Sequence, residues 1–396
     1  MNITLIGYEG IGGYGSIIYN LGKSLHERGY LHRLICKFSK KENLKINNSM
    51  IVEEPIFLRC IHFSLLSTWF FISRRIPERY YNELLFDLFS QRNIPHESDV
   101  LLCQSSGFVR SIRKAKEKGI YTIVQQRTAH PKFMYKLLEE ETKKFNAMED
   151  SIFMNKSWVK YRDISLKECD KVIAISNIVR DSCIEEGIPE EKIETISTGV
   201  GVDTEYFKPH KKENDKFRCL FVGHKTFING VPYLLEAWKT LNFKDADLII
   251  CGRQNKEIIA RYKKIINFKV PGTVNPVEYY KNASIFILPS LANAFPKAAL
   301  EAMSSGLPII ITEGVGTKDI IENGKEGFVV PIKDPDSLAK SIQYFYDNPD
   351  EVKRMGKNAR KTAEKCTWER YGDEVIEKIG KEGDIKIGKL KVLDGI

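Results

Sequence analysis

The first residues of this sequence whose types and spacing could bind a ligand are the glycines of ITLIGYEGIGGYGS, residues 3–16. Gly10, Gly12 and Gly15 satisfy the spacing G-x-G-x-x-G. In a dinucleotide-binding domain this spacing joins a strand to a helix and lets backbone N–H groups approach a pyrophosphate. The first question is therefore whether the sequence indicates a nicotinamide or flavin cofactor.

The surroundings of these glycines argue against a dinucleotide. The apolar run ITLIG ends three residues before the first glycine of the motif, so the turn is longer than the motif requires. The next apolar run, LHRLICKF, carries Arg33 and Lys37 and no carboxylate that would bind a ribose hydroxyl. We interpret Gly12 and Gly13 as a loop whose bare amides precede a helix starting near Ser16 and attract a phosphate or carboxylate. The alternative is a tight strand-to-helix turn with no ligand.

Composition restricts the remaining classes of function. The eight cysteines among 396 residues are scattered singly, which argues against a zinc site or a disulfide framework and for a reducing compartment. We expect no metal and, since the first residues resemble a strand rather than a signal peptide, a cytoplasmic protein. The net charge of +9 favours anionic partners. No nucleic-acid-binding motif accompanies this charge, and phosphates or an acidic membrane surface are the other anionic partners. The alternative is a general lysine-rich bias of composition with no particular partner.

Short apolar runs alternate with amphipathic helical stretches, which is typical of a parallel sheet covered on both faces. The pattern breaks into turn formers and charged residues over 196–217 and then starts again. We therefore predict an α/β fold with two doubly wound, Rossmann-like domains over 1–207 and 208–372. Residues 373–396 are expected to form a helix or tail that packs back on the first domain, with 383–396 as a short edge strand or tail. The cleft between the domains is the expected site.

The stretch SIFILPSLANAFPKAALEAMSSGLPIIIT, residues 284–312, resembles glycosyltransferase family 4, whose members are retaining nucleotide-sugar glycosyltransferases of the GT-B fold. The family pattern is a strand, Pro-Ser, Glu-Gly-Phe-Gly, four residues, and Glu-Ala-Met-Ala-x-Gly-x-Pro. Blocks over 169–209 and 220–238 also resemble the family, whereas 38–120 carry little of its signal. The residues that match in register are Pro289, Ser290, Phe295, Glu301, Ala302, Met303, Gly306 and Pro308.

The resemblance implies roles for the residues around the start of a helix near Pro296. Glu301 would bind the ribose of the donor, and its alternative is an exposed glutamate on the helix surface. Backbone amides of Phe295, Lys297 and Ala298 would meet the phosphate oxygens, as helix N-termini do. Pro296 offers no amide but suits the first turn of a helix.

Three positions depart from the family. The first glutamate of the pattern is Asn293 here, which can still form hydrogen bonds with the donor sugar. The arginine and lysine that bind the diphosphate are His224 and Asn229, and such cations provide the main electrostatic contribution expected at the leaving group. We expect Lys297 to replace them, with Lys225 or a protonated His224 as further candidates. The alternative for Lys297 is a solvated lysine in the first helical turn.

The first half contains a second candidate, the turn after the apolar run 120–126. It resembles a family segment in which a strand ends in a polar turn with a histidine, and His130 falls at that turn. We expect His130 to contact the transferred sugar or the acceptor, and Gln126 and Arg127 to contact the acceptor or a phosphate. The alternative for His130 is a purely structural role.

Residues 56–89 mix aromatic side chains with arginines. They contain too many charges for a transmembrane span, but an aromatic and basic helix can lie in a membrane interface. Acceptors in the family are often lipid-linked, which favours peripheral membrane contact here. The alternative is a buried helix pair with a basic exposed side.

The sequence thus predicts a retaining transferase that moves a sugar from a UDP- or GDP-sugar to a hydroxyl of a glycan or lipid-linked acceptor, with no further cofactor. His130, Asn293 and Glu301 are the candidate catalytic residues. A second hypothesis, motivated by the three departures, is a protein that keeps the fold and binds nucleotide, glycan or a partner without transfer. A nucleotide-sugar epimerase on the same fold is a third.

Overall fold

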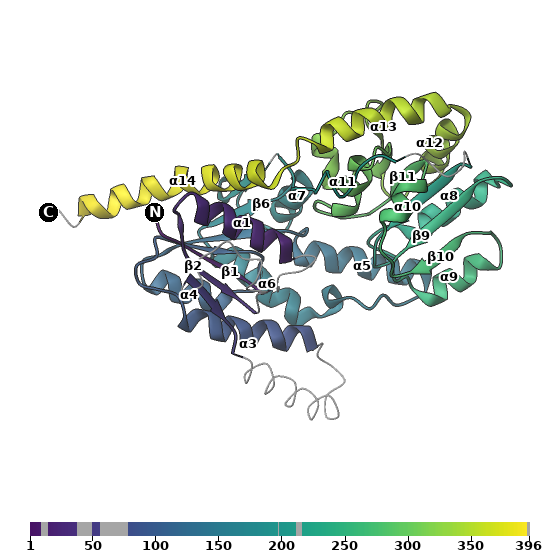
Figure 1. The fold of residues 1–396 in the computed structure, drawn as a ribbon. Coiled ribbons are helices and arrows are strands. Elements are labelled where there is room, and N and C mark those ends of the chain that lie inside the picture. Colours follow the sequence, from purple (N-terminus) through teal and green to yellow (C-terminus); the bar gives the residue numbers. More distant parts are fainter. Residues whose placement is uncertain (9–14, 38–49, 56–77, 197, 211–215, 394–396) are drawn as a thin grey trace.

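The structure is a computed structural model that describes residues 1–8, 15–37, 50–55, 78–196, 198–210 and 216–393. Two α/β halves, each with its own sheet, follow one another along the chain (Figure 1). Gly12 and Gly13 lie outside the described residues, so their expected contact with a phosphate stays a prediction.

Seven parallel strands form the sheet of the first half in the described residues. They are β1 (Ile3–Gly7), β2 (Leu31–Cys36), β3 (Ile51–Glu53), β4 (Val100–Cys103), β5 (Tyr121–Gln126), β6 (Lys171–Ala174) and β7 (Ile193–Thr195). Their order across the sheet is β3-β2-β1-β4-β5-β6-β7. The central strands β1, β4, β5 and β6 are buried at every position, because helices cover both faces of a parallel sheet. Burial on both faces explains why these strands appear in the sequence as largely apolar runs.

The helices of the first half follow the strands. They are α1 (Gly15–Glu27), α3 (Glu78–Arg92), α4 (Val109–Glu117), α5 (Pro131–Phe145), α6 (Lys156–Glu168) and α7 (Asn177–Glu185), with the short turns η3 (Ile152–Met154) and η4 (Glu190–Lys192). Helix α6 packs against both α4 and α5. The turn that begins α5 is therefore covered by neighbouring helices.

Six parallel strands form the second sheet in the part of the chain that the structure describes. They are β8 (Arg218–Val222), β9 (Asp247–Cys251), β10 (Lys269–Gly272), β11 (Ile285–Leu288), β12 (Ile309–Thr312) and β13 (Gly327–Val330), in the order β10-β9-β8-β11-β12-β13. The accompanying helices are α8 (Val231–Leu241), α9 (Lys256–Lys263), α10 (Val277–Asn282), α11 (Lys297–Ser304), α12 (Pro335–Asp347) and α13 (Pro349–Ala363), with the turn η5 (Gly316–Ile320). The predicted α/β fold of two doubly wound halves is confirmed.

The chain returns to the first half through α14 (Trp368–Leu393), which lies along α1 (Figure 1). Residues 383–393 are helical, so the edge strand that we considered for this stretch is wrong. Tyr371, Val375 and Ile379 recur every four residues and are fully buried, which anchors the first turns of the helix. Once such turns are fixed, each further residue adds a hydrogen bond at little cost, and the helix continues.

The stretch 56–89 is described only from residue 78 onwards, where it forms the start of α3. Phe86 and Asp87 on this helix are fully buried. The carboxylate of Asp87 accepts hydrogen bonds from the backbone N–H groups of Arg110 and Ser111 on α4. The described part of the stretch thus packs one face of α3 against α4, whereas residues 56–77, on which the expected membrane contact also depends, lie outside the described residues. Among the described residues, no helix has the length and apolar character that crossing a membrane requires.

Candidate active site

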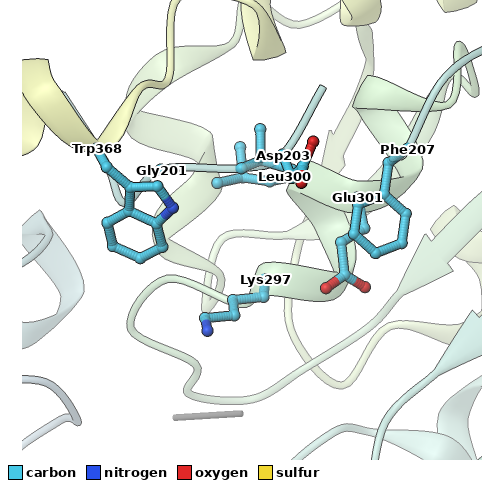
Figure 2. A pocket seen from close by; sticks show the side chains of 8 residues that line it. Gly201, Asp203, Phe207, Lys297, Leu300, Glu301 and Trp368 are labelled. Carbon is cyan, nitrogen blue, oxygen red and sulfur yellow. The ribbon is translucent and has the colours of Figure 1, made fainter. Parts of the chain in front are cut away.

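A cavity of about 180 Å³ lies between α11 and the segment that leads from the first half to the second (Figure 2). One helical face of α11 contributes three of its side chains, since residues at i, i+3 and i+4 project in the same direction. The remaining lining residues come from the two segments in which the chain passes between the halves: residues 201–207 lead to the second half, and Trp368 lies where the chain returns to the first. The lining residues are Gly201, Val202, Asp203, Phe207, Lys297, Leu300, Glu301 and Trp368.

Glu301 offers a carboxylate to this cavity. The hydroxyl of Tyr280 on α10 donates a hydrogen bond to Glu301 Oε2 over 3.0 Å and also lies 3.3 Å from the carbonyl oxygen of Ala298. Burial raises the pKa of Glu301, while the Tyr280 hydrogen bond and the charge of Lys297 oppose this effect. One carboxylate oxygen is thus fixed by the protein, and the geometry suits acceptance of hydrogen bonds from hydroxyls in the cavity.

The other predicted residues of this segment lie around the start of α11. Pro296 precedes the helix as its N-cap, with φ −70° and ψ 121°, rather than lying in the first turn as we expected. Phe295 is buried against Gly199 of the first half, where an added Cβ would approach the ring to 2.3 Å. The Nζ atom of Lys297 lies 5.7 Å from the centre of the Trp368 ring. Ala298 is half-buried in the first turn.

The asparagines at two of the three departing positions contact one another. Asn229 Oδ1 accepts hydrogen bonds from Asn293 Nδ2 (3.3 Å) and from the hydroxyl of Ser290 (3.0 Å). Asn229 Nδ2 donates to the carbonyl oxygen of His224. The backbone of Asn293 is paired in turn with Gly314. A neutral amide network therefore joins the loop after β8 to the loop after β11, at the positions where the family carries a lysine and a glutamate.

The cations of the loop after β8 have different surroundings. His224 is exposed, and its Nδ1 accepts a hydrogen bond of 2.9 Å from the backbone N–H of Arg253. The Nζ atom of Lys225 lies 5.1 Å from the ring centre of Phe153 in the first half, and burial lowers the pKa of Lys225. Lys225 thus contacts the first half and does not line the cavity. Arg253, which the sequence analysis missed, follows β9 as an exposed cation beside His224.

The turn before α5 has no open surface at its histidine. His130 is fully buried and is the N-cap of α5, where its Nδ1 accepts a hydrogen bond from the backbone N–H of Lys132. Its Nε2 lies 3.4 Å from Asp163 Oδ1 on α6. Burial lowers the pKa of His130 to about 4, against the opposing charges of Asp163 and Glu186. This geometry corresponds to the structural alternative, and it does not support the expected contact with an acceptor.

Gln126 and Arg127 lie at the end of β5 and also face their own half. Gln126 Nε2 donates to the carbonyl oxygen of Thr128, and Gln126 Oε1 accepts from the backbone N–H of Ser106. Arg127 lies close enough to Tyr371 of α14 to oppose the effect of burial, which raises the pKa of that phenol. Neither residue lines the cavity beside α11.

Metal ligation has no support in the described part of the chain, where no group of three or more His, Cys, Asp or Glu side chains is placed to hold an ion. No motif in the sequence pointed to Tyr280, Asp203 or Trp368, nor to Arg253. Their positions depend on how the two segments between the halves and α10 pack around α11, and no local sequence pattern signals this packing.

Two family models match successive parts of the chain. The family described as Glycosyltransferase Family 4 matches residues 11–204, and the family described as Glycosyl transferases group 1 matches residues 202–362. The boundary between the two matches falls in the segment that lines the cavity.

Two curated relatives are named as glycosyltransferases. An "uncharacterized glycosyltransferase" of Methanocaldococcus jannaschii is 26% identical over 236 residues, which cover 54% of this chain and 60% of the relative. A capsular polysaccharide biosynthesis glycosyltransferase of Staphylococcus aureus is 26% identical over 214 residues, which cover 49% of this chain and 56% of the relative. These alignments thus span less than two thirds of the relatives' own length.

A solved structure extends the likeness in fold to nearly the whole chain. The Anabaena protein HepE, in a structure with UDP and glucose, superposes with a TM-score of 0.68 and 12% sequence identity, over 96% of this chain and all of that one. At this identity the likeness shows the fold alone. The two family matches, which together span residues 11–362, identify the chain as a glycosyltransferase of the family 4 type, and the likeness to HepE shows the GT-B fold.

Proposed function

We propose that this protein transfers a sugar from a nucleoside-diphosphate donor to a hydroxyl of a glycan or lipid-linked acceptor, with retention of the anomeric configuration. The observation that carries the proposal is the cavity beside α11, where Glu301 is oriented by Tyr280 and accompanied by Lys297. Glu301 would accept hydrogen bonds from the ribose hydroxyls of the donor. Hydrogen bonds to an ionised acceptor are worth about 1.5–3 kcal/mol each.

The diphosphate would lie at the start of α11. Lys297 and Ala298 open the helix, and backbone N–H groups of a first helical turn are not used within the helix and favour an anion. Lys297 remains our candidate for the cation that neutralises the leaving group, and Arg253 beside His224 is a second. The proposed reaction needs no cofactor besides the sugar nucleotide.

The proposed chemistry needs no carboxylate base. The bond between the sugar C1 and the phosphate oxygen breaks, and C1 bonds to the acceptor oxygen on the same face. The proton of the acceptor hydroxyl goes to the leaving diphosphate. In this scheme Asn293 holds a hydroxyl of the transferred sugar through its amide, and Asn229 keeps that amide in place. The role of Asn293 is therefore to position the sugar, since an amide brings no charge to the transition state.

The relatives support the transferase over the two other hypotheses. Their descriptions name glycosyltransferases, one of them in capsular polysaccharide biosynthesis, and the HepE structure is a complex with UDP and glucose. A glycan acceptor and a UDP-sugar donor are thus the first substrates to be tested. No observation favours a binding protein without activity, or an epimerase.

Calorimetric titration with UDP and with GDP, followed by transfer and donor-hydrolysis assays over a panel of sugar nucleotides, tests the proposal. We expect micromolar binding of one nucleotide and release of that nucleotide from its sugar donor. Binding without turnover across the panel would instead support the binding protein. Absence of binding to both nucleotides would contradict the assignment of Glu301 and Lys297 to a donor site.

A further inference from the structure

Glu149 is a buried carboxylate for which the proposed reaction has no use. It lies between α5 and η3 in the first half and is only 7% exposed. Its Oε2 accepts a hydrogen bond of 2.5 Å from the backbone N–H of Phe227, in the loop between β8 and α8 of the second half. A carboxylate is costly to bury unless its partners compensate, so this contact between the halves calls for an explanation.

The two segments that meet at Glu149 are in extensive contact. The ring of Phe145 stacks on that of Phe227, with the centres 5.7 Å apart and the planes at 13°. Arg261 on α9 donates hydrogen bonds to the carbonyl oxygens of Phe145 and Asn146. Asn255 donates one to the carbonyl oxygen of Met148. The segment 145–149 of the first half is therefore docked on the second half.

The loop that Glu149 contacts has a backbone conformation that its surroundings must maintain. Lys225 has φ 71°, a left-handed value that is unfavourable for a residue with a side chain. Gly230 at the other end of the loop has φ 66°, and a Cβ there would approach the carbonyl oxygen of Pro289 to 1.9 Å. Such a conformation persists only where neighbouring groups fix it.

The same loop carries His224, whose Nδ1 accepts a hydrogen bond from the backbone N–H of Arg253, the second candidate for the cation at the diphosphate. It also carries Asn229, which joins the loop to Asn293. Asn229 Oδ1 is shared by Ser290 and Asn293, as described above. A continuous series of contacts thus runs from Glu149 in the first half, through the backbone of Phe227 and the side chain of Asn229, to Asn293 in the loop before α11.

We propose that Glu149 is a positioning residue for the donor site, which holds the loop between β8 and α8 from the opposite half and so makes nucleotide binding depend on contact between the halves. This inference rests on the proposed function for the identity of the ligand. It differs from that function in assigning the alignment of the loop to a residue of the first half that does not line the cavity.

Four variants test the role of Glu149. Glu149→Ala removes the acceptor, and Glu149→Asp keeps the carboxyl group but withdraws its oxygen from Phe227. Glu149→Gln keeps an acceptor oxygen at the same reach. Glu140→Ala is the matched control, because Glu140 also bridges the halves, through an ion pair of 2.7 Å with Lys333, without contacting the loop.

Two measurements are compared on these variants: calorimetric binding of UDP or of GDP, whichever the wild type binds, and hydrogen exchange of peptides covering residues 220–230. Loss of one buried hydrogen bond corresponds to a change of up to about tenfold in an equilibrium constant. We therefore expect Glu149→Ala and Glu149→Asp to weaken nucleotide binding about tenfold and to accelerate exchange in the loop. Glu149→Gln and Glu140→Ala should stay within about threefold of wild type in both.

The two proposals fail separately. If the wild type binds neither UDP nor GDP, the proposed function is contradicted, while the exchange of the loop still reports on Glu149. Unchanged exchange and affinity in Glu149→Asp would overturn the role of Glu149. Tighter nucleotide binding in Glu149→Ala would also overturn it, because the carboxylate would then compete with the phosphates for loop amides. Equal losses in Glu140→Ala would reduce Glu149 to a general contact between the halves.

Discussion

Helices α5 and α11 begin at the same kind of place, just beyond a buried strand of a parallel sheet, and their first residues have opposite surroundings. At the start of α11, Lys297 and Glu301 line a cavity together with Trp368. At the start of α5, His130 is fully buried and faces Asp163 of α6. Both segments carry polar residues suited to catalysis, and only one presents them to a space that a ligand can enter.

The difference lies in what packs over each helix start. Helix α6 covers the start of α5, and its Asp163 is paired with Lys132 as well as with His130. Over α11 lies the segment between the halves, where Gly201 is pressed against Trp368 and leaves room beside Glu301. In such a fold, ligands bind beyond the carboxyl ends of the parallel strands, and both helix starts lie there. Whether a helix start becomes a site depends on the neighbouring element.

The largest effect that would test this contrast is expected from Glu301→Ala. Removing an ionised acceptor from ribose hydroxyls should weaken UDP binding by about a hundredfold, near the upper end of the range for one charged hydrogen bond. Calorimetry measures the change, and Glu351→Ala on α13 serves as a control at a half-buried glutamate paired with Arg354, far from the residues that line the cavity. Unchanged affinity in Glu301→Ala would mean that the cavity is not the nucleotide site.

The opposite behaviour is expected at α5. His130→Ala removes an N-cap and leaves Asp163 facing a cavity, which should lower the free energy of unfolding by about 2 kcal/mol. Nucleotide affinity should stay within about twofold of wild type. Denaturant unfolding and calorimetry measure the two effects, and His130→Asn, which keeps a capping side chain, should recover part of the stability. A stable His130→Ala protein with lost transfer would restore the catalytic role predicted from the sequence.

The sequence predicted the scaffold well, because the central strands are buried on both faces and so appear as continuous apolar runs. It also placed Glu301 on the helix that borders the cavity, because the motif is in register with that helix, and the contact of Glu301 with a donor stays a prediction. The contacts of Asn229 with Asn293, and of Glu149 with Phe227, could not be predicted, since they join loops 64 and 78 residues apart. His130 was interpreted as a site residue because its turn is polar, and the sequence does not tell that α6 closes over it.

A smaller effect is expected at Lys297. If its ammonium neutralises the leaving diphosphate, Lys297→Ala should weaken UDP binding about tenfold and leave uridine binding nearly unchanged, because uridine lacks the phosphates. Comparing the two ligands separates charge from packing, since the side chain also contacts the Trp368 ring. Lys297→Arg should retain most of the affinity. Equal losses for UDP and uridine would assign Lys297 to the shape of the cavity, and Arg253 would become the first candidate for the cation.

The smallest expected effect is a pH dependence, which should appear in protein stability for His130 at the start of α5 and in nucleotide affinity for Glu301 on α11. An ordinary histidine titrates near pH 6.5, whereas burial lowers the pKa of His130 to about 4, with Lys132 and Lys167 acting in the same direction. Between these values the unfolded chain binds a proton that the folded chain does not. Stability therefore falls as the pH is lowered through this range, by less than about 1 kcal/mol between pH 7 and pH 6.

His130→Asn should lose this part of the pH dependence of unfolding, while the wild type keeps it. Glu301 should have its pH dependence in a different measurement. Burial raises the pKa of Glu301. As the pH is lowered, nucleotide affinity should therefore begin to fall at a higher pH than it would if Glu301 had the pKa of an ordinary glutamate, and Glu301→Gln should abolish this fall. If His130→Asn changed the pH profile of nucleotide affinity instead of that of unfolding, the turn before α5 would belong to the site, and the contrast with α11 would be wrong.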